Sequence, residues 1–140
     1  HSTRRRQRQM CIRDRRQTIA DKYNALISFN KDFVQFSLPK GTSSCYYKYF
    51  IRTSDNFSIP DFSKFMSENG IELPPTTYSY TCDQQSVCRE MECVYADSFE
   101  NAKYMTKHHV CLPMYNGLSE DEVGYIAKVI NRYLDKKDEN

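Results

Sequence analysis

The clearest pattern in this sequence is an amphipathic segment close to its C-terminal end. Ser119 and Glu122 have the spacing of a capping box, in which two side chains satisfy backbone N–H groups at the start of a helix. The apolar residues that follow recur every three or four positions; they are Val123, Ile126, Ile130, Tyr133 and Leu134. Such a helix must bury one face against a second layer, so the sequence predicts a layered domain around one core.

Three further segments carry the signals of helices. In residues 16–28, apolar side chains recur at helical spacing while charged side chains occupy the other side. Residues 58–70 begin with Ser58 as an N-cap and Pro60 in the first turn, and they end at a glycine. A fourth helix is predicted over residues 95–108.

Three short segments carry the signals of strands. Apolar and polar residues alternate in residues 34–38, and residues 44–52 are rich in aromatic residues that favour strands. The residues of this second strand that are expected to share one face are Tyr47, Tyr49 and Ile51. A third strand is predicted to begin at residues 71–73 and to stop at two prolines, whereas residues 110–114 are predicted to be an extended link. Helices interleaved with three short strands predict an α+β fold, an α/β two-layer sandwich.

The length and composition are those of one ordinary globular domain. The chain has 140 residues, of which 39% are hydrophobic and 27% are charged. Its longest apolar runs are far shorter than the roughly 20 residues needed to cross a bilayer, and no apolar stretch follows the basic N-terminus. We therefore expect a cytoplasmic protein with no membrane partner, whose six cysteines are free thiols.

The first 15 residues differ from the rest of the chain in charge. They hold six arginines and one aspartate, whereas residues 16–140 hold 14 basic and 17 acidic residues. The segment has no clear periodicity and no aromatic residue to stack on a base, so nucleic acid is not an expected partner. Residues 10–15 also resemble translated sequencing-adapter sequence. We expect residues 1–15 to be a disordered, non-native extension and residues 16–140 to be the folded domain.

Residues 74–93 show no sustained periodicity of either kind. A structureless segment of this length is uncommon in a compact domain unless it has a function. This segment is therefore the best candidate for a functional loop.

Four blocks of the sequence, in order, resemble the C-terminal third of the DegT/DnrJ/StrS family of sugar aminotransferases. A helix rich in Arg and Tyr is matched by residues 15–26, and a strand with an aromatic-polar-Tyr centre by residues 46–52. A helix that ends in a Gly-Ile step is matched by residues 66–73, and an LP segment that leads into a capped helix by residues 112–130. The order and spacing of the blocks make the resemblance more specific than any one of them.

This resemblance implies the small C-terminal domain of a fold-type I transferase that depends on pyridoxal 5'-phosphate. In that family a lysine of the large domain holds the cofactor as a Schiff base. An amino donor, usually glutamate, supplies the amine, which passes to a keto group of a nucleotide-linked sugar for cell-surface polysaccharide or related glycan synthesis. The resemblance also implies a homodimer. It implies that the fragment binds no cofactor and is inactive alone.

The resemblance assigns no catalytic or cofactor-binding residue to this chain. The lysines that are expected to be ordinary surface residues are Lys22, Lys31, Lys40, Lys48, Lys64 and Lys103. In the loop after the Gly-Ile step, Thr76 and Cys82 stand where the family often has histidines, and Gln84 remains. Tyr78 and Tyr80 each offer an apolar face and a hydroxyl, so these two residues and Gln84 are the candidate substrate-binding residues. Surface or dimer-interface tyrosines are the alternative.

Two other site hypotheses stay open. The residues that could form a zinc site, and so make the chain a non-catalytic binding module, are Cys82, Cys88, Cys93, His108, His109 and Cys111. Their spacings are not those of the usual CxxC zinc knuckles. His108 and His109 could form a proton-transfer pair, or they could simply favour the C-terminal end of a helix.

Overall fold

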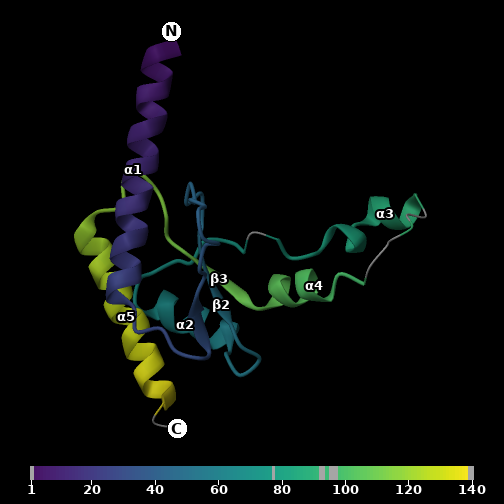
Figure 1. Cartoon of the computed structure of the whole chain (residues 1–140). Helices are drawn as coiled ribbons and strands as arrows, with labels where there is room; N and C mark the ends of the chain where they lie inside the picture. The colour runs from purple at the N-terminus through teal and green to yellow at the C-terminus, as the bar shows by residue number, and fades with distance from the viewer. Residues whose placement is uncertain (1, 77, 92–93, 95–97, 139–140) are drawn as a thin grey trace.

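The computed structural model describes residues 2–76, 78–91, 94 and 98–138. The elements in chain order are α1 (Ser2–Leu26), β1 (Phe33–Gln35), β2 (Tyr49–Thr53), α2 (Ile59–Glu68), a 3-10 turn η1 (Cys82–Gln84), α3 (Ser86–Glu90), α4 (Glu100–Lys107), β3 (His109–Leu112) and α5 (Glu120–Asp138). This arrangement confirms the predicted α+β class (Figure 1). None of the described helices combines the length and the apolar character that a membrane span requires.

The three strands form one antiparallel sheet in the order β1-β2-β3. In the central strand, Ile51 pairs with Gln35 on one side and with Val110 on the other. Alternate residues of β2 are buried and exposed, as expected for a strand with one face on the core. The prediction for Tyr47 was wrong: its side chain is 66% exposed, because the backbone of Tyr46 turns through a left-handed φ of 44° before β2 begins.

The third strand lies elsewhere in the sequence than predicted. Residues 71–73 pair with no strand, because Gly70 adopts a φ of 74° and the N–H of Ile71 donates to the Met66 carbonyl at the end of α2. The segment predicted as a link forms β3 instead. All four residues of β3 are buried, so the segment lacks the alternation that marks a half-exposed strand.

The first helix extends across the N-terminal basic segment. We expected disorder in residues 1–15, but residues 2–15 are the first half of α1. Arginine, glutamine and methionine favour helix, and no proline or glycine interrupts the segment. Arg15 also donates from its Nη2 to the Leu118 carbonyl over 2.8 Å. The boundary between residues 15 and 16 remains a prediction, since α1 runs across it without a break.

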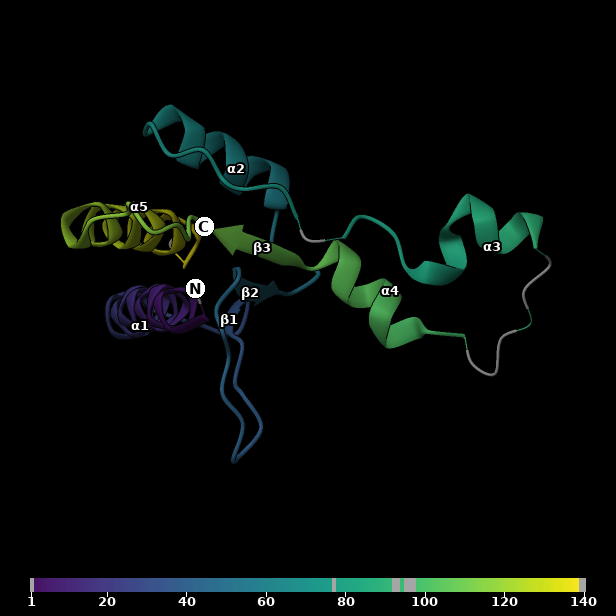
Figure 2. The same cartoon turned by 90° about the horizontal axis from the view of Figure 1, so that it is seen from above.

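The core lies between the sheet and three helices. The helices α1 and α5 lie side by side in both views, and α2 packs against α5 (Figures 1 and 2). The buried residues that these elements contribute include Ile19, Tyr23, Phe33, Ile51, Phe62, Met66, Leu112, Val123 and Ile130. Within this core, the rings of Phe33, Phe57, Phe62 and Tyr133 pack with centroid separations between 5.1 and 5.7 Å.

Two buried tyrosine hydroxyls and one asparagine connect elements of this core through hydrogen bonds. The Tyr23 hydroxyl donates to the Pro113 carbonyl over 2.9 Å, and the Tyr49 hydroxyl donates to the Asn24 side chain. Burial raises the pKa of both phenols well above the ordinary value, and the neighbouring phenols raise them further. At the end of α1, Asn131 donates to the Leu26 carbonyl over 2.8 Å and accepts from the Ser28 N–H over 2.9 Å.

A second region extends away from this core. We call residues 78–108, as far as they are described, the arm, and the other described residues the body. In both views α3 lies far from the body, and α4 leads back to β3 (Figures 1 and 2). No residue of α4 is buried. The exposed apolar side chains of the arm include Tyr78, Tyr80, Val87, Met91, Val94 and Phe99.

Candidate functional site

A cavity of about 640 Å³ opens where the arm meets the sheet. The body contributes Phe36 and Phe50, together with His109 at the start of β3. The arm contributes the loop before α3 and one face of α4. The described residues that line the cavity are Phe36, Phe50, Tyr78, Tyr80, Thr81, Cys82, Asp83, Phe99, Ala102, Met105, Thr106 and His109. This lining is mainly apolar and aromatic with a few polar groups, which is typical of a site for a small organic ligand.

The structure places two of the three predicted substrate-binding residues at this cavity. Tyr78 and Tyr80 line it and keep exposed side chains. Gln84 is not among the described lining residues, because its Oε1 accepts hydrogen bonds from the Thr81 N–H and hydroxyl, both over 3.1 Å. Cys82, which stands where the resemblance leads one to expect a histidine, also lines the cavity.

An ion pair fixes the loop of the cavity to α4. Lys103 Nζ lies 3.3 Å from the Asp83 carboxylate, whose side chain is only 13% exposed. The Thr81 hydroxyl and then the Lys103 ammonium hold the pKa of Asp83 below its ordinary value. Sequence periodicity could not reveal this pair, since its two residues lie 20 positions apart in segments without a shared pattern.

Two consecutive histidines close the C-terminal end of α4. His108 Nδ1 lies 2.9 Å from the Tyr104 carbonyl, and His109 Nδ1 lies 2.6 Å from the Met105 carbonyl. A carbonyl oxygen only accepts, so each Nδ1 carries a proton and donates. These bonds satisfy carbonyls in the last turn of the helix, which supports the helix-end interpretation of the pair.

The described cysteines do not form a metal site. Cys11, Cys45, Cys82 and Cys88 are free thiols. No three His, Cys, Asp or Glu side chains of the described residues are grouped so that they could hold a metal ion. Cys93, a member of the hypothetical zinc set, lies outside the described residues.

Comparison with known proteins places this site in a family. A model of the DegT/DnrJ/EryC1/StrS aminotransferase family matches residues 7–131. The chain belongs to this family. The match spans α1 to α5, so it includes the body, the arm and the cavity between them. No curated protein sequence matches the chain.

Solved structures of aminotransferases share the fold. A DegT/DnrJ/EryC1/StrS aminotransferase from Brucella abortus has a TM-score of 0.69 at 21% identity, over 86% of this chain and 30% of its own. DesV from S. venezuelae, solved in complex with a ketimine intermediate, has a TM-score of 0.72 at 14% identity, over 86% of this chain and 31% of its own. PseC from Helicobacter pylori, an aminotransferase of pseudoaminic acid biosynthesis, has a TM-score of 0.67 at 16% identity, over 88% of this chain and 33% of its own. The chain therefore spans about a third of the length of these structures.

Proposed function

We propose that this chain is the small C-terminal domain of a sugar aminotransferase that uses pyridoxal 5'-phosphate. The parent enzyme would transfer an amino group from glutamate to a keto group of a nucleotide-linked sugar, for a cell-surface polysaccharide or a related glycan. The family match over residues 7–131 carries this proposal. The shared fold of DesV and PseC, and the short span of their chains that is covered, support the assignment to one domain.

The cavity between the arm and the body is the part of this domain that we assign to the substrate. Tyr78 and Tyr80 provide flat apolar faces for a ring and hydroxyls for hydrogen bonds with a sugar. The side chains of Thr81, Asp83 and Thr106 add polar groups to the lining. Gln84 contributes indirectly, because its side chain caps the turn that follows the two tyrosines.

The described residues do not fit a pocket for the cofactor. A cofactor held as a Schiff base requires a lysine amine at the site, and the described lining of the cavity contains no lysine. The nearby Lys103 is paired with Asp83, and Lys48 donates to the Pro75 carbonyl over 2.9 Å. We therefore assign the cofactor and its lysine to a different part of the parent enzyme, and we expect the chain alone to be inactive.

The exposed apolar side chains of the arm support a homodimer of the parent enzyme. The arm presents several large apolar groups that the described residues leave uncovered, and patches of this kind mark contact surfaces. We assign the parent to the cytoplasm.

The experiment is to recover the coding DNA on the 5' side and to express the complete reading frame. We expect a visible absorption band of bound cofactor and transfer of the amino group from glutamate to a nucleotide-linked keto sugar, whereas residues 1–140 alone show neither. A complete reading frame that encodes no cofactor-binding domain would overturn the proposal.

Substitutions in the cavity test the substrate assignment within that enzyme. Tyr80→Phe and Tyr78→Phe should raise KM for the sugar by several-fold, since a hydrogen bond contributes about 1 kcal/mol. Tyr125→Phe is the matched control, because Tyr125 is an exposed tyrosine of α5 that is absent from the cavity lining. Unchanged KM in both cavity variants would contradict the assignment.

A non-catalytic binding module is the alternative function. A zinc-stabilised module would need a cluster of metal-binding side chains, and the described residues contain none. Metal content of the purified chain tests this alternative, and zinc bound in a one-to-one ratio would favour it.

A further inference from the structure

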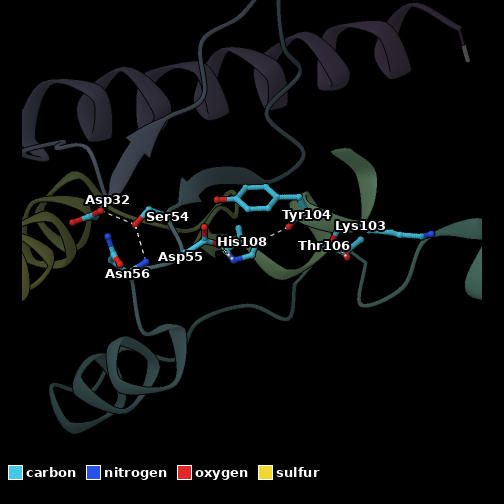
Figure 3. A network of polar contacts seen from close by, with 8 residues as sticks. All are labelled: Asp32, Ser54, Asp55, Asn56, Lys103, Tyr104, Thr106 and His108. Carbon is cyan, nitrogen blue, oxygen red and sulfur yellow. Dashed lines mark hydrogen bonds and ion pairs between the residues drawn. The ribbon is translucent and has the colours of Figure 1, made fainter. Parts of the chain in front are cut away.

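One histidine joins the arm to the body through both nitrogens of its ring. His108 Nε2 lies 2.9 Å from Asp55 Oδ1, in the turn between β2 and α2 (Figure 3). On its other side, Nδ1 lies 2.9 Å from the Tyr104 carbonyl in α4. The ring stacks on the Tyr104 ring with a centroid separation of 3.9 Å and an interplanar angle of 14°. The His108 carbonyl accepts from the Thr53 N–H of β2 over 3.0 Å.

The partners of His108 determine how many protons its ring must carry. A carbonyl oxygen and an ionised carboxylate are both acceptors, and neither can donate. Both ring nitrogens of His108 therefore need a proton if both contacts are to be hydrogen bonds. A neutral imidazole has one N–H, so it can satisfy either Tyr104 or Asp55 but not both.

The carboxylate that faces His108 is on a turn whose position is fixed. The Ser54 hydroxyl donates to Asp32 over 2.6 Å and accepts from the Asn56 N–H over 3.1 Å (Figure 3). From α5, Lys137 donates to the Asn56 carbonyl over 2.7 Å. These bonds tie the turn to β1 and α5, so Asp55 belongs to the body while the His108 ring belongs to the end of the arm.

The elements around His108 carry other charged groups, several of which are bonded to residues other than His108. The titratable and charged groups on these elements are Asp32 before β1, Arg52 in β2, Lys103 and Lys107 in α4, His109 at the start of β3, and Lys137 in α5. The His109 ring bonds through Nδ1 to the Met105 carbonyl. Asp32 accepts from the Ser54 hydroxyl, and Lys137 donates to the Asn56 carbonyl. Lys103 forms an ion pair with Asp83. Among the described residues, Asp55 is the one that forms an ion pair with His108.

We propose that His108 and Asp55 form a pH-sensitive clamp that fixes α4, and with it one wall of the cavity, to the body. The clamp is closed when the imidazole carries two protons and Asp55 is ionised. Loss of one ring proton breaks one of the two hydrogen bonds, so the clamp loosens when the ring is deprotonated. Four residues of the cavity wall, from Phe99 to Thr106, lie in or next to α4. The closed clamp therefore restrains the position of that wall. This inference does not depend on the proposed enzyme activity.

The test is to measure amide hydrogen exchange in α4 of the 140-residue chain by NMR, at about pH 6 and at about pH 8. The measured rates are corrected for the intrinsic exchange rate at each pH. Protection of the amides near the end of α4, such as that of His108, should be about two- to fivefold higher at the lower pH, the range expected for one partly exposed ion pair. In His108→Gln and in Asp55→Asn this difference should vanish, because the glutamine does not titrate and the asparagine amide can donate to a neutral ring.

Glu120→Gln is the matched control, since it removes an exposed carboxylate from an ion pair, with Lys22, that contains no histidine. This variant should keep the pH difference in α4. Protection of wild-type α4 that is equal at the two pH values, or a difference that persists in Asp55→Asn, would overturn the clamp.

Discussion

The body and the arm of this domain are held together in different ways. In the body, aromatic and aliphatic side chains from α1, α2, α5 and the sheet bury one another completely. In the arm, α4 has no buried residue and large apolar side chains face outward. Single polar links hold the arm instead: the Lys103–Asp83 pair joins α4 to the loop before α3 within the arm, and the His108–Asp55 pair joins the end of the arm to the body.

This difference indicates which region contributes more to the stability of the chain. Burial of apolar area is the main favourable term in folding, so the body supplies most of the free energy of unfolding. Exposed ion pairs contribute little each, so the arm can be reordered at small cost.

The largest expected effect comes from a cavity in the aromatic core of the body. Phe62 is fully buried against Phe33, Phe57 and Tyr133, so Phe62→Ala should lower the free energy of unfolding by about 3–5 kcal/mol. Urea denaturation measured by circular dichroism checks this value. Tyr80→Ala in the arm should change it by about 0.5 kcal/mol or less. Equal losses in the two variants would contradict the comparison.

A buried hydrogen bond of the body should have the next largest effect. Tyr23→Phe removes the hydroxyl that donates to the Pro113 carbonyl and leaves a buried acceptor unpaired, which should cost about 1–3 kcal/mol. Tyr125→Phe removes the bond of an exposed hydroxyl to the Asn69 carbonyl and serves as the control. Urea denaturation gives the free energy of unfolding of both variants. A larger decrease in Tyr125→Phe than in Tyr23→Phe would contradict the expectation that the buried hydrogen bond contributes more.

The junction of α1 and α5 should show a smaller loss. Asn131→Ala removes the two hydrogen bonds that close the end of α1, at a cost of about 1 kcal/mol. Asn101→Ala on the exposed surface of α4 should be nearly neutral. If thermal denaturation gives the same midpoint for both variants, Asn131 does not connect the helices as described.

The smallest effect concerns the link between Asp83 and α4. The pKa of Asp83 is lowered in the folded chain, so its contribution is present above the ordinary carboxyl pKa of about 4 and is lost as the pH falls below that value. In a pH titration followed by NMR, the amide signals around Lys103 in α4 of the wild type should show a transition at acidic pH. Asp83→Asn should abolish that acidic transition without altering the signals of β2. A transition retained in the variant would exclude Asp83 as its source.

Local signals in the sequence were sufficient for much of the body. The capping box is present, since the Ser119 N–H donates to Glu122 over 2.7 Å and the Glu122 N–H donates to Ser119 over 3.2 Å. The five apolar residues predicted to share one face of α5 are all buried. The strand β3 was missed because it is buried on both faces, and a fully buried strand shows no period of two.

The cavity could be predicted only in part. The lack of periodicity in residues 74–93 indicated the right segment, and Tyr78 and Tyr80 line the cavity. The other wall comes from Phe36, Phe50 and His109, which the sheet brings beside the arm from distant parts of the chain. Contacts of this kind depend on strand pairing, and no local pattern contains them.

Hydrogen–deuterium exchange with mass spectrometry on the 140-residue chain tests the contrast between the two regions most directly. At neutral pH, peptides from residues 19–26 of α1, from α5 and from β2 should exchange only through global unfolding, whereas peptides from residues 78–91 and 98–107 should exchange many times faster through local opening. Arm peptides that are protected as strongly as those of α5 would contradict the account.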